Sequence, residues 1–292
     1  MQKILITGID SFTGKHLSNY LTQVGYDVYG TSLFKADAKK YKCDITNKED
    51  VLQVFRQVVP DFIIHLSAIS FVGHGNNEEF YRVNTIGTTN ILDALIKLNI
   101  RPKKTILVSS ATIYGNQGLE VLDESLCPKP ANHYGASKYA MESLASSYFE
   151  KLPIIITRPF NYTGVGQSPN FLIPKIVSHF KEKKESIELG NLHVSREFND
   201  VAFVCEVYKR LLETQEDSLT LNIASNRGIK LLDVIDMMQD IAGYKIDVQI
   251  NPAFVRPNEI KSLTGSSEKL FGVIGNVGLK EFKQTLTEMY EA

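Results

Sequence analysis

Tyr134 and Lys138 are the two residues whose types and spacing could do chemistry. They stand four positions apart in the stretch YGASK, which follows a turn-rich segment and opens a helical run to about residue 151. A four-residue offset places both side chains on one face of a helix, so a phenol and an ammonium can converge on one point. Because a neighbouring ammonium favours the phenolate, we expect the pKa of Tyr134 to lie below its usual value of about 10, which would let Tyr134 exchange a proton near neutral pH. Many amphipathic helices carry such a pair without any function, so other elements must support this interpretation.

A dinucleotide-binding turn is predicted at the N-terminus. Residues 3–7 form a short apolar run without polar alternation, typical of a parallel strand buried on both faces, and a glycine turn then leads into an amphipathic helix over residues 15–24. Gly8 allows the tight turn, Gly14 allows helix and strand to approach, and the amides at the helix N-terminus can hold a pyrophosphate. Ser11 replaces a third glycine but still permits close backbone approach. The cofactor-binding residues expected in this turn are Gly8, Ser11, Phe12, Thr13 and Gly14.

The end of the second predicted strand, residues 27–32, bears on the choice of dinucleotide. A carboxylate at this position would bind the ribose hydroxyls of NAD, but the strand ends in Ser32. Ser32 with Lys35, Lys39 and Lys40 downstream suits the extra phosphate of NADP better, although no arginine supplies a planar clamp and Asp37 is a competing carboxylate. We therefore expect NADP(H) as the preferred cofactor and NAD(H) as the alternative.

A third strand is predicted over residues 42–45. It ends in Asp44 and Ile45, which are expected beside the adenine of the cofactor. The other interpretation of Asp44 is an N-cap for the helix predicted over residues 48–58, and both can hold together.

Two more buried strands complete a regular alternation of strands and helices. Residues 61–68 contain His65, expected to be a packed strand residue, and strand 104–108 leads directly to Ser110. This alternation predicts an α/β fold with a Rossmann-type, doubly wound parallel sheet, whose ligands bind at the C-terminal ends of the strands. Ser110 and Tyr134 would both be delivered to that edge. Three residues that close the fourth strand are expected against the cofactor: Leu66, Ser67 and Ala68.

Composition narrows the class of partner. The 292 residues include 32 basic and 33 acidic ones, and no basic stripe with interleaved aromatics occurs, so we do not expect nucleic acid as a partner. Cys43, Cys127 and Cys205 are far apart and lack metal-ligand spacing, which fits a reducing compartment and predicts no metal site. Neither a signal peptide nor an apolar run of spanning length is evident, so we expect a cytoplasmic protein without a membrane partner.

Taken in order, these segments resemble the extended short-chain dehydrogenase/reductase family that acts on nucleotide sugars. The resemblance covers essentially the whole chain and implies that Tyr134 donates or accepts the proton, that Lys138 binds the nicotinamide ribose and tunes Tyr134, and that Ser110 hydrogen-bonds the reacting oxygen. The motifs that carry it are residues 8–14, His65-Leu66-Ser67-Ala68, Ser109-Ser110-Ala111, Tyr134 with Lys138, and Arg158-Pro159-Phe160-Asn161.

The same resemblance implies that different parts of the chain bind the cofactor and the nucleotide sugar. Residues 1–160 would form the NADP-binding domain, with segments around 190–225 returning to it, and residues 161–292 would mainly form a smaller C-terminal α/β lobe for the nucleotide sugar. In this second half we expect helices at 171–184, 202–213 and 230–242, strands at 153–158, 218–223 and 245–250, and a strand or hairpin from 190 towards 201.

Five residues are expected to bind the substrate. Ser70 lies in the loop that would cover it. The resemblance implies that Asn161 contacts the sugar diphosphate, although a loop amide can equally bond its own backbone. It also implies that Arg196 binds the diphosphate, as a bidentate guanidinium can. The segment around Arg256 and Glu259 looks most like that of the reductases that turn GDP-4-keto-6-deoxy-mannose into GDP-rhamnose, which implies that Arg256 meets phosphate and Glu259 the ribose. An ordinary surface ion pair is the alternative for these two.

The reaction must be argued from the site, because this fold supports reductases, 4-epimerases and 4,6-dehydratases. The related dehydratases place an acid and a base just after the catalytic hydroxyl, where this chain has Ala111 and Thr112. A 4-epimerase needs no further acid, but its usual NAD would favour a carboxylate at Ser32. We therefore expect an NADPH-dependent reductase of the C4 ketone of a nucleotide-linked 6-deoxy sugar, in deoxysugar biosynthesis for surface polysaccharide. The alternatives are an NAD-dependent nucleotide-sugar 4-epimerase and a cofactor-sensing binding protein without chemistry.

A homodimer is also expected. The helices predicted over residues 84–98 and 134–151 correspond to those that pair into a four-helix dimer interface in similar proteins.

Overall fold

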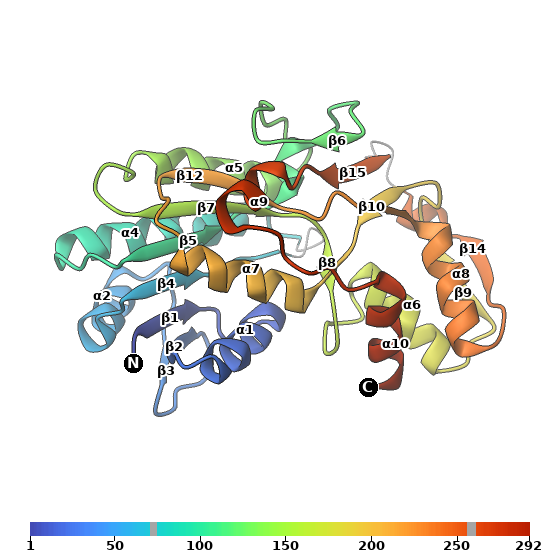
Figure 1. The fold of residues 1–292 in the computed structure, drawn as a ribbon, viewed down its shortest axis with the longest axis horizontal. Coiled ribbons are helices and arrows are strands. Elements are labelled where there is room, and N and C mark those ends of the chain that lie inside the picture. Colours follow the sequence, from blue (N-terminus) through green and yellow to red (C-terminus); the bar gives the residue numbers. More distant parts are fainter. Residues whose placement is uncertain (71–74, 256–260) are drawn as a thin grey trace.

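A seven-stranded parallel sheet, in the order β12-β7-β5-β4-β1-β2-β3, lies at the centre of the N-terminal half (Figure 1). The structure is a computed structural model and describes residues 1–70, 75–255 and 261–292. The order confirms the predicted doubly wound sheet, because the chain builds outward from β1 in one direction and then in the other. The strands are β1 (Lys3–Thr7), β2 (Asp27–Ser32), β3 (Lys40–Lys42), β4 (Phe62–His65), β5 (Lys104–Val108), β7 (Ile154–Pro159) and β12 (Leu219–Ile223).

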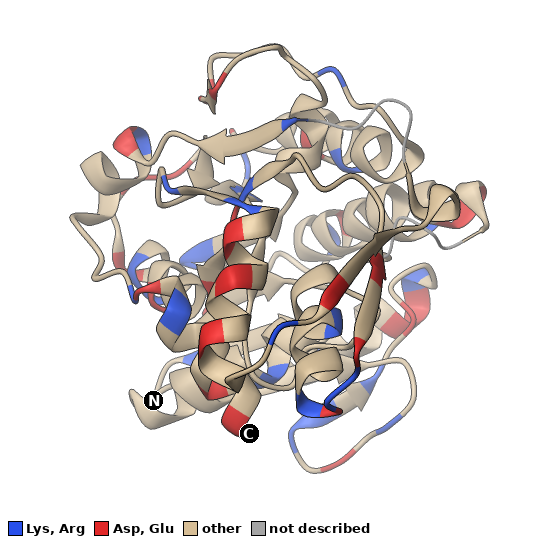
Figure 2. Cartoon of the chain, turned by 90° about the vertical axis from the view of Figure 1, so that its right-hand side faces the viewer, with Lys and Arg blue, Asp and Glu red and all other residues tan. Residues whose placement is uncertain are grey.

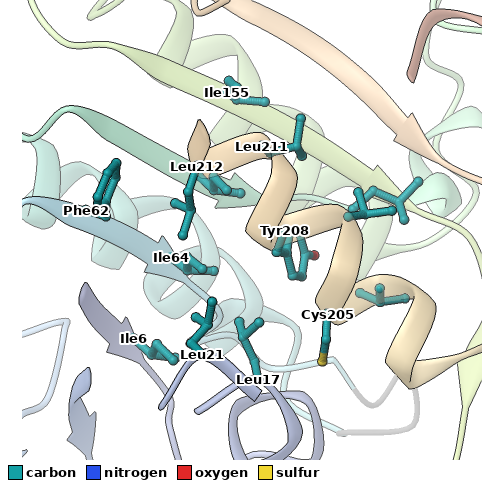
Figure 3. Packing of buried hydrophobic residues seen from close by; sticks show 14 of the residues in the cluster. Ile6, Leu17, Leu21, Phe62, Ile64, Ile155, Cys205, Tyr208, Leu211 and Leu212 are labelled. Carbon is teal, nitrogen blue, oxygen red and sulfur yellow. The ribbon is translucent and has the colours of Figure 1, made fainter. Parts of the chain in front are cut away.

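Helices cover both faces of this sheet. Alternate side chains of β1 enter different cores: Ile4 and Ile6 pack towards α1 and α7, whereas Leu5 packs towards α2, α4 and α5. Figure 3 shows the first core, where Tyr208 and Leu211 of α7 meet side chains of α1 and of the central strands. Burial on both faces explains why the strand sequences lack polar alternation. The covering elements are α1 (Phe12–Gln23), α2 (Lys48–Val58), α3 (Asn77–Phe80), the π-helical η1 (Tyr81–Gly87), α4 (Thr88–Lys97), the 3₁₀ turn η2 (Ala111–Tyr114), α5 (His133–Ser146) and α7 (Val201–Glu213).

The remaining elements lie mostly beside the large sheet, at the right of Figure 1. A four-stranded sheet has the order β13-β10-β15-β6, and two strand pairs, β14-β9 and β11-β8, accompany it. Helices α6, α8 and α10 share a separate apolar core. The bounds are β6 (Val121–Leu122), β8 (Tyr162–Thr163), α6 (Leu172–Lys181), β9 (Ser186–Leu189), β10 (Ser195–Glu197), β11 (Asn199–Asp200), β13 (Gly228–Lys230), α8 (Leu231–Ala242), β14 (Asp247–Ile250), η3 (Pro252–Phe254), β15 (Ser262–Gly265), α9 (Glu268–Ile274) and α10 (Phe282–Glu291).

Several boundaries differ from the predictions because local caps override the apolar pattern. The first helix begins at Phe12 rather than at residue 15, since the Ser11 hydroxyl accepts a hydrogen bond from the Gly14 amide at 3.0 Å. The third strand ends at Lys42 and does not reach Asp44. Helix α5 ends at Ser146, five residues before the predicted end.

Figure 2 colours the ribbon by residue type, and positions of Lys or Arg and of Asp or Glu are interspersed along the described chain. Over residues 1–70, 75–255 and 261–292, every helix is too short or too polar to cross a bilayer. In the same described ranges, no three His, Cys, Asp or Glu side chains gather as a metal ion would require.

Candidate active site

The C-terminal ends of five parallel strands meet at one edge of the large sheet. Gly8 follows β1, Ser32 ends β2, Ser67 follows β4, Ser110 follows β5 and Asn161 follows β7. Parallel pairing points all five ends the same way, so residues from distant parts of the sequence share this edge.

The glycine turn after β1 forms a tight cradle. Gly8 has a φ of 71°, in the left-handed region, and a Cβ atom there would lie 3.1 Å from the Ser67 backbone. A Cβ on Gly14 would lie 2.5 Å from the Gly8 carbonyl oxygen. The first amides of α1 open towards this turn and carry the positive end of the helix dipole. These residues therefore fit a pyrophosphate, whereas the Ser11 side chain is engaged as the cap of α1.

A connection that the sequence did not reveal joins this turn to the second half of the chain. The Thr13 and Tyr162 hydroxyls are hydrogen-bonded at 2.7 Å, and the Phe12 and Tyr162 rings stack at 6.3 Å between centroids. The segment that follows β7 thus packs directly on the first turn of α1.

An anion and a cation lie beside the end of β2: Asp10 in the turn after β1 and Lys40 at the start of β3. The Ser32 hydroxyl accepts hydrogen bonds from two following backbone amides, and hydrogen bonds from Ser32 and then Lys40 lower the pKa of the Asp10 carboxyl. Lys40 Nζ lies 2.9 Å from Asp10 Oδ1. Lys39, which was predicted to serve the same phosphate, instead pairs with Asp27 at 2.5 Å, near the start of the strand.

Asp44 and Ile45 are engaged within the fold. Asp44 Oδ1 accepts from the Thr46 amide at 2.9 Å, and the N-cap of α2 is Asn47, so the interpretation of Asp44 as that N-cap was wrong. The Ile45 side chain is buried, and its carbonyl oxygen accepts from Asn90 at 2.9 Å. Asn47, three residues further on, caps α2 instead, because its short side chain reaches the second amide of the helix.

His65 is a structural residue, as predicted. Its ring nitrogens are hydrogen-bonded to Thr7 at 2.6 Å and to Thr88 at 2.8 Å. Burial, and then the charge of Lys138, lower the pKa of His65 to about 3, so the ring stays neutral. The Thr7 hydroxyl also accepts from the Ser67 amide at 3.2 Å, which fixes the start of the strand-end segment. Three half-buried residues form this segment: Leu66, Ser67 and Ala68.

Ser110 and Tyr134 lie together at the end of β5. Ser110 is the N-cap of η2, and its hydroxyl accepts from the Thr112 amide at 3.2 Å and from the Thr112 hydroxyl at 2.9 Å. The start of α5 approaches η2 closely, because a Cβ on Gly135 would lie 3.0 Å from the Thr112 carbonyl oxygen. This approach brings the phenol of Tyr134 into hydrogen-bonding contact with Ser110.

The proton affinity of Tyr134 is opposite to the sequence-based expectation. Burial raises the pKa of Tyr134 to about 12, and the hydrogen bond with Ser110 offsets only part of that increase. The ammonium of Lys138 donates instead to the Val108 carbonyl at 2.7 Å, and burial lowers the pKa of Lys138 to about 8. Tyr134 is therefore a neutral phenol in desolvated surroundings.

Asn84 is a positioning residue that sequence reasoning missed. Its Oδ1 accepts from the Ile69 amide at 2.8 Å, and its Nδ2 donates to Ser137 Oγ at 3.0 Å. Asn84 thereby holds the chain just before the exposed Ser70 against α5. Its neighbours in the sequence, Thr85, Thr88, Thr89 and Asn90, are also polar, so nothing in the sequence distinguished Asn84 from them.

The predicted substrate residues are only partly brought to the edge. Asn161 is exposed, and its carbonyl oxygen accepts from the Asn199 amide at 2.9 Å. Arg196 lies half-buried in β10, where its Nη1 donates to the Ser195 carbonyl at 2.8 Å. The next residue, Glu197, is buried and accepts from the Gly265 amide at 3.0 Å, which anchors β10 to β15.

Arg256 and Glu259 lie outside the described residues, between η3 and β15.

A protein-family comparison places this geometry among known enzymes. The model of the family described as GDP-mannose 4,6 dehydratase matches residues 5–289. The chain belongs to this family. Membership confirms the resemblance to nucleotide-sugar enzymes of the extended short-chain dehydrogenase/reductase type.

Two curated relatives cover nearly the whole chain. The GDP-6-deoxy-D-talose 4-dehydrogenase of Aggregatibacter actinomycetemcomitans is 38% identical over 291 residues, which are 99% of this chain and 97% of that protein. The GDP-6-deoxy-D-mannose reductase of Pseudomonas aeruginosa is 29% identical over 285 residues, 94% of this chain and 91% of that protein.

Two solved structures share the fold and differ in their bound cofactor. RMD from Pseudomonas aeruginosa, complexed with NADPH, has a TM-score of 0.87 and 27% identity, and the match covers 100% of this chain and 97% of that one. The UDP-glucose 4-epimerase of Thermus thermophilus, complexed with NAD, has a TM-score of 0.85 and 25% identity, with 99% of this chain and 98% of that one covered.

The close approach at Gly14 predicts a loss of stability on substitution. Gly14→Ala would force a methyl group against the Gly8 carbonyl, so we expect the free energy of unfolding, measured by urea denaturation, to fall by about 1–3 kcal/mol. Gly272→Ala in α9 is the matched control, since a Cβ there meets nothing within 4 Å. A Gly14→Ala protein as stable as the original would contradict the tight cradle.

Proposed function

We propose that the protein is an NADPH-dependent reductase of the C4 ketone of a nucleotide-linked 4-keto-6-deoxyhexose, with GDP as the nucleotide, and that it serves deoxysugar biosynthesis for surface polysaccharide. The observation that carries the proposal is the buried pair of Ser110 and a protonated Tyr134, one helical turn from the ammonium of Lys138. The names of both curated relatives support a GDP-linked 6-deoxy sugar that reacts as a ketone or hydroxyl.

In this proposal the chain's own residues handle the ketone oxygen. The hydride comes from the nicotinamide cofactor when it is bound. Ser110 donates a hydrogen bond to the reacting oxygen, and Tyr134 supplies the proton as negative charge develops there. Because burial keeps the pKa of Tyr134 at about 12, the phenol retains that proton until the oxygen becomes basic. Lys138 contributes a fixed positive charge and binds the nicotinamide ribose.

We assign the other roles to the residues predicted from the sequence. The cofactor would be held by the turn over residues 8–14, by the ends of β2 and β4 and by the segment after β3. A division at about residue 160 would separate cofactor binding from substrate binding, although α7 and β12 return to the large sheet. Free thiols at all three cysteines suit the cytoplasm. The proposed substrate contacts are Ser70, Asn161, Arg196, Arg256 and Glu259.

A 4-epimerase is the second candidate, and one observation favours it. The Asp10 carboxylate, hydrogen-bonded to Ser32, could take the role of the ribose-binding carboxylate that β2 lacks and so favour NAD. A dehydratase is less well supported, because η2 presents Ala111 and Thr112 where an added acid and base would be needed.

Turnover tests the proposed mechanism. Mixing the enzyme with NADPH and a GDP-4-keto-6-deoxyhexose should consume NADPH in equal amount to the sugar, and NMR of the product would give the C4 configuration, which differs between 6-deoxytalose and 6-deoxymannose. We expect Tyr134→Phe to lower kcat by about 10²–10⁴-fold while the Kd for NADPH stays nearly unchanged. Full activity in Tyr134→Phe would overturn the mechanism, and interconversion of sugars without net NADPH loss would favour the epimerase.

The ion pair at the end of β2 predicts the cofactor preference. Lys40→Gln should weaken NADPH binding about tenfold and leave NADH binding nearly unchanged, whereas Asp10→Asn should favour NADPH further, because the 2′-phosphate interacts with both charges. Fluorescence titration at one salt concentration would measure each Kd. Lys39→Gln is the control, since Lys39 pairs with Asp27 near the start of the strand. Equal losses for NADPH and NADH would count against this assignment.

A homodimer through η1, α4 and α5 is also part of the proposal. These elements expose the apolar side chains of Ile86, Ile96, Tyr139 and Leu144, which pairing of the helices would cover. We expect sedimentation to give a dimer and Leu144→Lys to give a monomer. Leu232→Lys on α8, a comparably exposed leucine, should leave the dimer intact; a monomeric parent protein would refute the interface.

A further inference from the structure

The face of α5 that carries Tyr134 and Lys138 continues to a third ionisable residue. Glu142 lies four positions beyond Lys138, so the three side chains follow one another along the helix. Glu142 is only 5% exposed, and Lys138 only 4%. A carboxylate buried this deeply one turn from a buried ammonium is costly unless it is paired and hydrogen-bonded.

Arg158, near the end of β7, provides the pairing. Its Nη2 lies 2.7 Å from Glu142 Oε2, and its Nε lies 3.1 Å from Glu142 Oε1, which is a bidentate contact. Its Nη1 donates to the Tyr114 hydroxyl at 2.9 Å, and that hydroxyl donates to Asn222 Oδ1 at 2.8 Å. One guanidinium therefore joins α5 to η2 and, through Tyr114, to β12.

Helix α5 and the turn η2 are the elements that deliver the reacting groups. Ser110 caps η2, and Tyr134 and Lys138 stand on α5. A guanidinium has a rigid planar fork, so its bonds to Glu142 and Tyr114 restrict the spacing of the two elements.

We propose that Arg158 and Glu142 are positioning residues of the reaction: Arg158 holds the Glu142 carboxylate beneath Lys138, where it keeps the lysine charged, and fixes η2 against α5. The proposal rests on the proposed roles of Ser110, Tyr134 and Lys138. It assigns these two residues an effect on the reaction although neither touches the site itself.

The surroundings of Lys138 make Glu142 the decisive charge. On α5 the neighbouring Tyr134 is neutral, and on β4 the neighbouring His65 is neutral because burial lowers its pKa to about 3. The contact from β5 is the Val108 carbonyl, which is uncharged and accepts a hydrogen bond from the Lys138 ammonium. Burial lowers the pKa of Lys138, and the Glu142 carboxylate opposes that change. Tyr114 of η2 faces Arg158 rather than Lys138.

The free protein provides the first test. With lysine labelled at the ε-carbon with ¹³C and the Lys138 resonance assigned from Lys138→Met, a pH titration of the original protein should have its midpoint near 8. Glu142→Gln should lower that midpoint by about one pH unit or more, and Glu142→Asp, which keeps the charge, should restore most of it. Glu206→Gln, which removes the carboxylate paired with Arg210 at 2.6 Å on α7, is the matched control and should not move it.

Enzyme kinetics provide the second test. Because Lys138 acts as the ammonium, activity should fall as pH rises through its midpoint, and in Glu142→Gln this fall should occur at lower pH by the same interval. Tyr114→Phe removes the link to η2 and leaves Glu142 paired, so it should lower kcat without moving the pH profile.

The outcomes that would overturn the proposal are distinct from those that would overturn the proposed function. A folded Glu142→Gln protein with an unchanged Lys138 midpoint would overturn the positioning role. If Glu142→Gln does not fold, a folded Tyr114→Phe protein with an unchanged kcat would overturn it, because the proposal requires the link from Arg158 to η2. A shifted midpoint in a protein that reduces no sugar nucleotide would refute the proposed function and leave the electrostatic role standing.

Discussion

The buried ammonium of Lys138 is the constraint on which the candidate site depends. A lysine that is 4% exposed loses most of its hydration, and the fold compensates with the Val108 carbonyl and with a carboxylate one helical turn away. The same desolvation keeps the neighbouring Tyr134 protonated. Exclusion of water from the start of α5 thus favours the neutral form of both side chains: it keeps Tyr134 protonated, whereas the charge of Lys138 depends on the Glu142 carboxylate.

Parallel strand order explains how so many distant residues share one edge. Each strand of the large sheet ends towards the same side, and helices return the chain to the opposite side before the next strand begins. Contacts between the cofactor turn and the later segments then join the two halves. The hydroxyl pair of Thr13 and Tyr162 and the stacked rings of Phe12 and Tyr162 place the segment after β7 directly against the predicted cofactor turn.

Family membership leaves the reaction open, because relatives with this fold are named as dehydratases, epimerases, dehydrogenases and reductases. The differences among such reactions lie in a few groups beside the pair of phenol and ammonium. In this chain η2 offers Ala111 and Thr112 next to Ser110, and the end of β2 offers an ion pair rather than a lone carboxylate. The residues at these two places, and not the architecture, bear on the choice among these reactions.

The amino-acid sequence determined the elements that need only local or periodic information. The apolar runs within residues 3–7, 61–68, 104–108 and 153–158 became the buried parallel strands β1, β4, β5 and β7, because apolar residues without alternation bury both faces. The glycine turn, Ser110 and the Tyr134–Lys138 pair followed from short-range spacing. Short strands such as β6 and β15 were not foreseen, since they pair with each other across more than a hundred residues of chain. Tertiary structure alone decided the proton affinity of Tyr134, the partners of Lys40 and Lys39, and the contact of Arg158 with Glu142 and Tyr114. Desolvation and charge pairing depend on which distant groups surround a side chain, and that is a property of the packed fold.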